Sequence, residues 1–137
     1  MNDIYILDAC ALVALLKGEQ GADVVWDVLF KNTTGSAIVF MHEINLLEVY
    51  YGFYRERGKD YAYQKLEQCV EFFTTIQGLT SAVFTEAGRL KTSYKVSIAD
   101  AIILAQASIS SGIVLTADHH EMDIVEQNEN IAFKWIR

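Results

Sequence analysis

The sequence predicts an α/β protein, a three-layer α/β/α sandwich with a mainly parallel central sheet. Predicted strands and helices alternate along the chain, and the strands are continuous apolar runs such as DIYIL at 3–7 and IVLT at 113–116. Strands that are covered by helices on both faces have such apolar runs, whereas strands with one solvent-exposed face alternate polar and apolar residues. In a sheet of this kind, ligands bind at the carboxyl ends of the strands, near the point where the strand order reverses.

The spacing of apolar residues and the turn residues between them place the elements in order. We expect strands at 3–7, 37–40, 73–76, 113–116 and 131–136. We expect helices at 9–18, 19–31, 43–57, 60–73, 80–94, 98–110 and 118–127, with a loop at 32–36. Gly18 is a helix stop, and Thr80 and Ser97 are N-caps.

The 137 residues predict one domain, residues 1–137, because this length buries enough surface for a core and no repeat or linker interrupts it. Hydrophobic residues make up 52% of the chain, yet the longest apolar runs are too short to span a bilayer. No leader pattern is present at the start. We therefore expect a cytoplasmic protein with no membrane segment, and Cys10 and Cys69 as reduced core thiols.

The formal net charge of −7 argues against a protein that binds nucleic acid by electrostatics alone. An enzyme that holds several acids for a metal is compatible with it. Six of the eleven basic residues fall in two short segments, and these are either solvated helix ends or a surface that faces a substrate. The six are Arg55, Arg57, Lys59, Arg89, Lys91 and Lys95.

Three acids fall at predicted strand ends or helix starts. Asp8 directly follows the first strand, Asp118 follows the strand 113–116 by two residues, and Asp100 lies in the first turn of the helix 98–110. Each has an alternative reading as a helix cap or as part of a capping box. Because parallel strands end at one edge of the sheet, the three can also converge on one site.

Glu48 has no such alternative, since it lies in the middle of the helix 43–57. With Asn45, Gly52 and Arg55 it forms one narrow polar stripe, while the remaining positions are apolar nearly all round. This pattern predicts a helix that is buried on most sides and shows one polar line to a cleft. An ion pair between Glu48 and Arg55 is the structural alternative.

Four converging carboxylates repel one another and raise each other's pKa, so the arrangement requires a cation among them. Ligation by oxygen alone favours Mg²⁺ or Mn²⁺ over zinc. A divalent ion with free coordination positions is suited to hydrolysis of phosphodiester bonds. His119 and His120 are expected at a surface or helix start rather than at zinc, because no Cys or third His is suitably placed.

Four motifs in this order resemble the PIN domain family of ribonucleases, and within it the VapC-type toxins of toxin–antitoxin pairs. They are YILDACALVALL with Asp8, INLLEVYYG with Glu48, SIADAIILAQA with Asp100, and VLTADHHEMD with Asp118. The resemblance spans about residues 4–135. The motif around Asp8 departs from the family at Cys10, where a hydroxyl residue is common.

The resemblance implies a PIN-like sandwich and a Mg²⁺- or Mn²⁺-dependent endoribonuclease. Asp8, Glu48, Asp100 and Asp118 would be the catalytic and metal-binding acids. Supporting positions would be Asn45 and Thr116 beside the metals and Glu121 as an extra acid. The substrate-binding residues would be Arg55, Lys91 and Lys95, which would guide RNA.

The resemblance also implies an antitoxin protein as partner, and we expect a homodimer that uses apolar surface near 20–31 and 43–73. The tyrosines of the segment 50–63 are expected in the core or in a subunit contact rather than stacked on bases. Three other functions remain open: a phosphatase with Asp8 as nucleophile, a PIN-fold nuclease of RNA processing, and a module that binds RNA or protein without catalysis.

Overall fold

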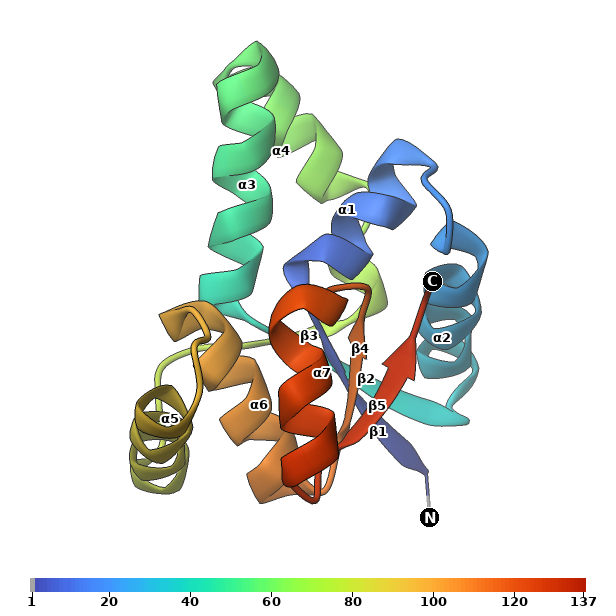
Figure 1. The fold of residues 1–137 in the computed structure, drawn as a ribbon. Helices are drawn as coiled ribbons and strands as arrows, with labels where there is room; N and C mark the ends of the chain where they lie inside the picture. The colour runs from blue at the N-terminus through green and yellow to red at the C-terminus, as the bar shows by residue number, and fades with distance from the viewer. Residues whose placement is uncertain (1) are drawn as a thin grey trace.

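The computed structural model describes residues 2–137 and shows a five-stranded parallel sheet between two layers of helices (Figure 1). The strands, in the spatial order β3-β2-β1-β4-β5, are β1 (Asp3–Leu7), β2 (Ala37–His42), β3 (Thr74–Ile76), β4 (Ile113–Thr116) and β5 (Ala132–Trp135). The helices of the described chain are α1 (Ala9–Lys17), α2 (Ala22–Thr34), α3 (Glu43–Arg57), α4 (Lys59–Glu67), α5 (Ser81–Ser93), α6 (Ile98–Ser110) and α7 (His119–Asn128), with a 3₁₀ turn η1 (Val70–Phe72).

Successive residues of each central strand face opposite sides of the sheet and enter two separate cores. Tyr5 and Leu7 of β1 pack with α1, α2, α3 and α4, whereas Ile6 packs with α5, α6 and α7. In the same way Leu115 and Val114 of β4 enter different cores. Each fully buried Leu or Ile contributes about 1.5–3 kcal/mol of stability. The predicted three-layer sandwich is confirmed.

The strand order reverses at the centre of the sheet. From β1 the chain adds β2 and β3 on one side, whereas β4 and β5 lie on the other. The loops after β1 and β4 therefore leave the sheet side by side at its carboxyl edge. This edge, which lies toward α1 in Figure 1, is where a ligand site is expected in such a sheet.

The second helix differs from its prediction at both ends. It was expected at 19–31, with a loop at 32–36, but it runs from Ala22 to Thr34. Gly21 has a left-handed conformation that delays the start, and the N–H of Gly35 bonds the carbonyls of Asn32 and Lys31 to close the helix. Helix ends are set by such local bonds, which apolar spacing does not reveal.

Two other elements also have bounds that differ from the prediction. β2 extends to His42, because Met41 and His42 pair with β3. The segment predicted as one helix, 60–73, forms two elements: α4, which ends at Glu67, and the 3₁₀ turn η1. The caps at Thr80 and Ser97 are confirmed, since each side-chain oxygen accepts a backbone N–H of the following helix.

The expected burial of helix α3 is wrong. Only Asn45, Val49 and Phe53 are fully buried, and a stripe of large apolar side chains is open to solvent on the other side. The reason is visible in Figure 1, where α3 and α4 form a hairpin that projects beyond the sheet. No described helix is both long and apolar enough to cross a membrane.

A glycine substitution tests the packing at the start of α2. Gly21 has φ +97°, and a Cβ there would lie 2.6 Å from the carbonyl oxygen of Ile136, whereas Gly18 has φ +65° and open space around it. We expect Gly21→Ala to lower the free energy of unfolding by about 2–4 kcal/mol, and Gly18→Ala by about 1 kcal/mol. Urea unfolding of both variants measures the difference, and equal losses would contradict the close approach of Gly21 to Ile136.

Candidate active site

Five carboxylates line one hollow of about 330 Å³ at the carboxyl edge of the sheet. The lining residues come from the starts of α1, α6 and α7 and from the first half of α3, and they include no Lys or Arg. They are Asp8, Ala9, Cys10, Glu48, Ser97, Asp100, Asp118 and Glu121. The four acids predicted from sequence therefore lie together, and Glu121 joins them.

Asp8 is held by three groups at the end of β1. Its Oδ1 accepts the N–H of Ala9 at 2.7 Å, and its Oδ2 accepts the Thr116 hydroxyl at 2.6 Å and the Cys10 thiol at 3.3 Å. Asp8 is thus the N-cap of α1 and a wall of the hollow at once. The cap reading is correct for this residue, and the same carboxylate lies where the sequence predicted a site.

Asp118 has the same double role at the start of α7. Its Oδ1 accepts the N–H of Glu121 at 3.3 Å, which makes it the N-cap of that helix. Its own N–H bonds the Thr116 hydroxyl at 3.0 Å. Thr116 therefore joins the loops after β1 and β4 through a single oxygen, as its place in the T-x-D motif suggested.

Asp100 lies in a capping box that is only half made. Its N–H donates to the Ser97 hydroxyl at 3.0 Å, whereas the reciprocal bond from the N–H of Ser97 to the Asp100 carboxyl is not made. The Asp100 carboxyl is therefore free of the capping role that the S-x-x-D pattern predicts. It faces the other acids, and the carboxylate of Glu121 accepts a hydrogen bond from it.

The crowding of acids shows in their proton affinities. Burial, the hydrogen bond to Glu121 and the charges of Asp8, Glu121 and Asp118 raise the pKa of Asp100 from 3.8 to about 9. Burial raises the pKa of Asp8 despite its three hydrogen bonds. The bond from Asp100 lowers the pKa of Glu121. The two carboxyls thus differ in proton affinity: the pKa of Asp100 is raised and the pKa of Glu121 is lowered.

Glu48 enters the hollow from α3. It is half-buried, and burial followed by the charges of Asp8 and Glu121 raises its pKa. The alternative ion pair with Arg55 is wrong, since the described residues contain no such pair and the Arg55 guanidinium lies over the Tyr51 ring. Glu48 therefore has a cleft and other acids near it, and no basic partner.

The acids offer a geometry suited to a divalent cation. Asp100, Asp118 and Glu121 each have a ligand atom within 4.8 Å of the others. Asn45, one turn before Glu48, is fully buried, and neither its amide nitrogen nor its amide oxygen has a partner among the described residues. Glu121 Oε2 is also buried without a partner. Such orphaned polar atoms cost about 1–3 kcal/mol each unless a further group binds them.

Cys10 has more contacts than the sequence suggested. Besides Asp8, its sulfur lies 3.4 Å from the Thr116 hydroxyl and accepts the N–H of Ala117 at 3.4 Å. The thiol thus links the loop after β1 to the loop after β4. Its position two residues after Asp8 was the only signal for this role.

The histidines lie outside the hollow, as expected. His119 stacks on Trp135 and bonds Asp123, and His42 caps α3 and bonds the carbonyl of Gly78. No histidine belongs to a metal-type cluster in residues 2–137. A zinc site of the kind considered from the sequence is therefore not formed by these residues.

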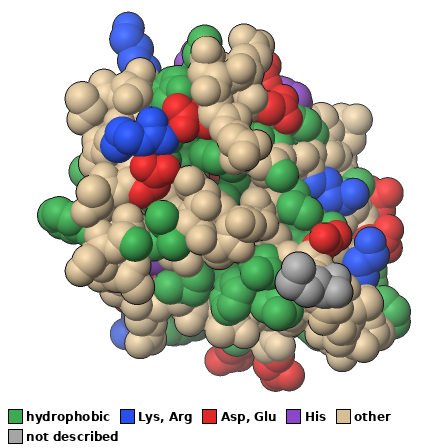
Figure 2. All heavy atoms as spheres, turned by 90° about the horizontal axis from the view of Figure 1, so that it is seen from below, with side chains coloured by type: hydrophobic (Ala, Val, Ile, Leu, Met, Phe, Trp, Pro, Cys, Tyr) green, Lys and Arg blue, Asp and Glu red, His purple; other side chains and the backbone are tan. Residues whose placement is uncertain are grey.

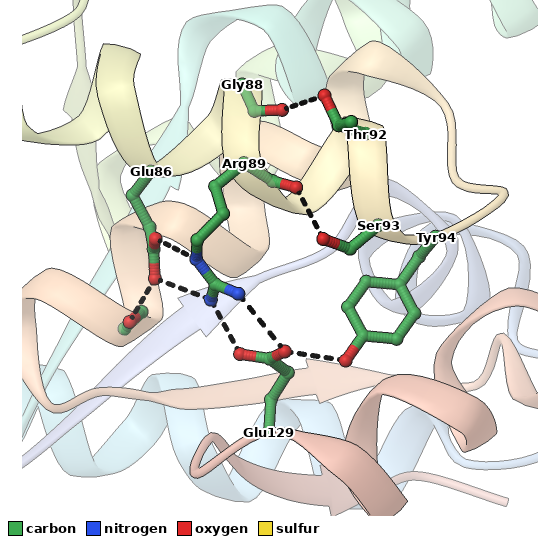
Figure 3. A network of polar contacts seen from close by, with 8 residues as sticks. Glu86, Gly88, Arg89, Thr92, Ser93, Tyr94 and Glu129 are labelled. Atoms are coloured by element: carbon green, nitrogen blue, oxygen red, sulfur yellow. Dashed lines mark hydrogen bonds and ion pairs between the residues drawn. The ribbon is translucent and has the colours of Figure 1, made fainter.

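The second basic segment is only partly free for a substrate. Figure 3 shows the Arg89 guanidinium between Glu86 and Glu129, with the Tyr94 hydroxyl on Glu129. This network holds α5 to the end of α7. Lys91 is exposed, and its charge helps to lower the pKa of Glu121, so it lies on the side of the acids. Lys95 is exposed as well.

The opposite end of the molecule has no comparable concentration of acids. Figure 2 shows the face at the amino ends of the strands, where red acidic side chains are scattered between hydrophobic groups and several lie beside Lys or Arg. The strongly acidic surface is therefore the carboxyl edge of the sheet, where the strand order reverses.

Comparison with known proteins agrees with this geometry. The PIN domain family model matches residues 5–126, and the chain belongs to the PIN domain family. No curated protein sequence gave a significant match.

The fold is similar to solved structures of VapBC proteins. A chain of VapBC2 from Rickettsia felis, bound to a DNA fragment from its promoter, is 18% identical with a TM-score of 0.76, over 96% of this chain and 97% of that one. A chain of DNA-bound VapBC from Salmonella typhimurium is 15% identical with a TM-score of 0.74 over 100% of both. VapC20 of Mycobacterium tuberculosis, a toxin that cleaves the sarcin-ricin loop, is 13% identical with a TM-score of 0.59, over 80% and 86%.

The pKa of Asp100 leads to a stability prediction. Because its pKa is higher in the folded than in the unfolded chain, its contribution to stability is full below about pH 4 and is lost as the pH rises toward 9. Asp100→Asn removes this loss, so we expect the metal-free variant to be more stable than the parent at pH 8 by about 1–3 kcal/mol.

Urea unfolding in EDTA at pH 5 and pH 8 measures this difference. The gain should be smaller at pH 5 than at pH 8, because the unfolded carboxyl is then closer to its own pKa. Asp27→Asn on the exposed surface of α2 is the matched control and should change neither value. An Asp100→Asn variant that is less stable than the parent at pH 8 would contradict the crowded-acid account.

Proposed function

We propose that this chain is a Mg²⁺- or Mn²⁺-dependent endoribonuclease that hydrolyses RNA phosphodiester bonds, and that it is the toxin of a toxin–antitoxin pair. One observation carries the proposal: five carboxylates share a hollow that no Lys or Arg lines. An anionic RNA backbone can enter such a hollow only when cations neutralise the acids.

The residues present fit a hydrated divalent ion. The oxygens of Asp100, Asp118 and Glu121 would hold it, with Asp8 as a further ligand and water at the remaining positions. An all-oxygen ligand set with room for water suits Mg²⁺ or Mn²⁺. When bound, such an ion activates a water and stabilises negative charge on a phosphate.

The chain's own groups have separate tasks in this proposal. The hydroxyl of Thr116 and the thiol of Cys10 fix the Asp8 carboxylate, and Thr116 also fixes the backbone of Asp118. Glu48, whose pKa is raised, accepts a hydrogen bond from the attacking water and orients it. Exposed Arg55, Lys91 and Lys95 contact phosphates on either side of the hollow.

The proposed partners follow from the surface and from the relatives. Some of the similar solved structures are toxin–antitoxin complexes, such as one from Klebsiella pneumoniae that is 17% identical with a TM-score of 0.71. We propose a cytoplasmic antitoxin whose basic residue would enter the acidic hollow. Exposed Trp26 and Phe30 on α2, and Phe84 and Ile98 on α5 and α6, offer apolar surface for the antitoxin and for a homodimer.

Cleavage of RNA tests the proposed reaction. Purified protein is incubated with single-stranded and structured RNAs in EDTA or in Mn²⁺. We expect cleavage in Mn²⁺ only, and a fall in rate of at least about 100-fold for Asp8→Asn, because a ligand and its hydrogen-bonded support are lost together.

Asp123→Asn is the matched control, since Asp123 lies on α7 with Asp118 and Glu121 but is exposed and bonds His119. This variant should cleave at the parental rate. Cleavage in EDTA, or full activity of Asp8→Asn, would exclude the proposed mechanism.

A further inference from the structure

The outer face of α3 carries a stripe of exposed apolar side chains that the fold does not use. Leu47, Tyr51 and Tyr54 are 54%, 43% and 48% exposed, and they are spaced by four and three residues, so they lie on one side of the helix. Helix α3 packs against α4, α1, β2 and α6 by its other sides (Figure 1). An exposed stripe of this kind marks a surface for a partner.

Positive charge lies beside two tyrosine rings, that of Tyr51 in the stripe and that of Tyr61 on α4. The Arg55 guanidinium lies 5.3 Å from the centre of the Tyr51 ring, and that of Arg57 lies 5.2 Å from the Tyr61 ring. Neither arginine forms an ion pair with any residue of the described range. In a chain with a net charge of −7, unpaired arginines on tyrosine rings are a local positive surface.

The distance of this surface from the acids suits an extended polymer chain that runs from the hollow along α3. Tyr51 lies about 5 Å and Arg55 about 10 Å beyond Glu48 along the helix axis, from the rise of 1.5 Å per residue. A polymer in the acidic hollow that continues along α3 therefore meets Tyr51 and Arg55 next.

We propose that this face binds the nucleotides that flank the cleaved bond on one side, with a base stacked on the Tyr51–Arg55 pair and a phosphate near Arg55. Bases stack on aromatic rings and on guanidinium planes, and arginine also neutralises phosphate. An apolar protein segment would match Leu47 and Tyr54 but would leave both arginines without counter-charges. The inference rests on the proposed nuclease function, which supplies the RNA in the hollow.

Binding of a labelled RNA tests it separately from cleavage. The probe is a fluorescein-labelled single-stranded RNA of 12 nucleotides and mixed sequence, and every variant carries Asp100→Asn to prevent cleavage. We expect Tyr51→Ala to weaken binding about tenfold and Tyr51→Phe to keep it within about twofold, because stacking needs the ring and not the hydroxyl. Arg55→Ala should weaken binding and reduce the dependence of log K on log salt by about one.

Ile109→Ala is the matched control, because Ile109 is a large apolar residue that is 49% exposed at the far end of α6, away from this face. It should bind the RNA as tightly as its background. Circular dichroism melts of the same proteins check that each variant is folded.

The outcomes separate this inference from the proposed function. If Tyr51→Ala binds RNA normally while the protein with all catalytic acids cleaves it, the inference is wrong and the nuclease stands. If Tyr51→Ala weakens RNA binding but no metal-dependent cleavage is found, the RNA-binding face is confirmed and the proposed nuclease function is wrong. If Tyr51→Ala keeps its RNA affinity but turns a dimer into a monomer in sedimentation, the face is a contact between copies and the inference is overturned.

Discussion

Repulsion among the carboxylates at the carboxyl edge of the sheet is the constraint on which the functional part of the structure depends. The reversal of strand order between β1 and β4 brings Asp8 and Asp118 to one edge, and α3 and α6 add Glu48 and Asp100. Several groups at this edge reduce the repulsion. Thr116 and Cys10 donate hydrogen bonds to Asp8, and the N-termini of α1 and α7 face acids. The raised pKa of Asp100 favours its neutral form. The site is stable without a cation only at the cost of neutralising one of its own acids.

The same constraint connects stability with function. A carboxyl that takes up a proton on folding lowers stability at neutral pH, so the groups that make the edge suitable for a cation also weaken the metal-free chain. The loss is offset by the two cores on either side of the sheet, which bury Ile6, Leu7, Val114 and Leu115 of the central strands fully. A protein can keep a destabilised site when the rest of the fold contributes more stability than the site removes.

Much of this arrangement could be predicted from sequence, because the relevant signals are local. Apolar runs define buried strands, and an acid one or two residues after such a run lies at the sheet edge, which located Asp8 and Asp118. Glu48 stood out as an unpaired charge in an apolar helix. What could not be predicted depends on tertiary contacts: the capping box at Ser97 that stays half made, the use of Arg89 in an ion-pair network, and the exposure of Tyr51 on a projecting hairpin. Apolar spacing shows that a helix has an apolar face, but not which side the rest of the fold covers.

The central claim is that one divalent cation takes the place of the proton held by Asp100. Calorimetric titration of Mn²⁺ at pH 7, in two buffers with different ionisation enthalpies, measures this exchange directly. Since the pKa of Asp100 is about 9 without metal, Mn²⁺ should bind with release of about one proton per ion, and Asp100→Asn should release much less. Absence of Mn²⁺ binding, or binding without proton release by the parental chain, would contradict the account.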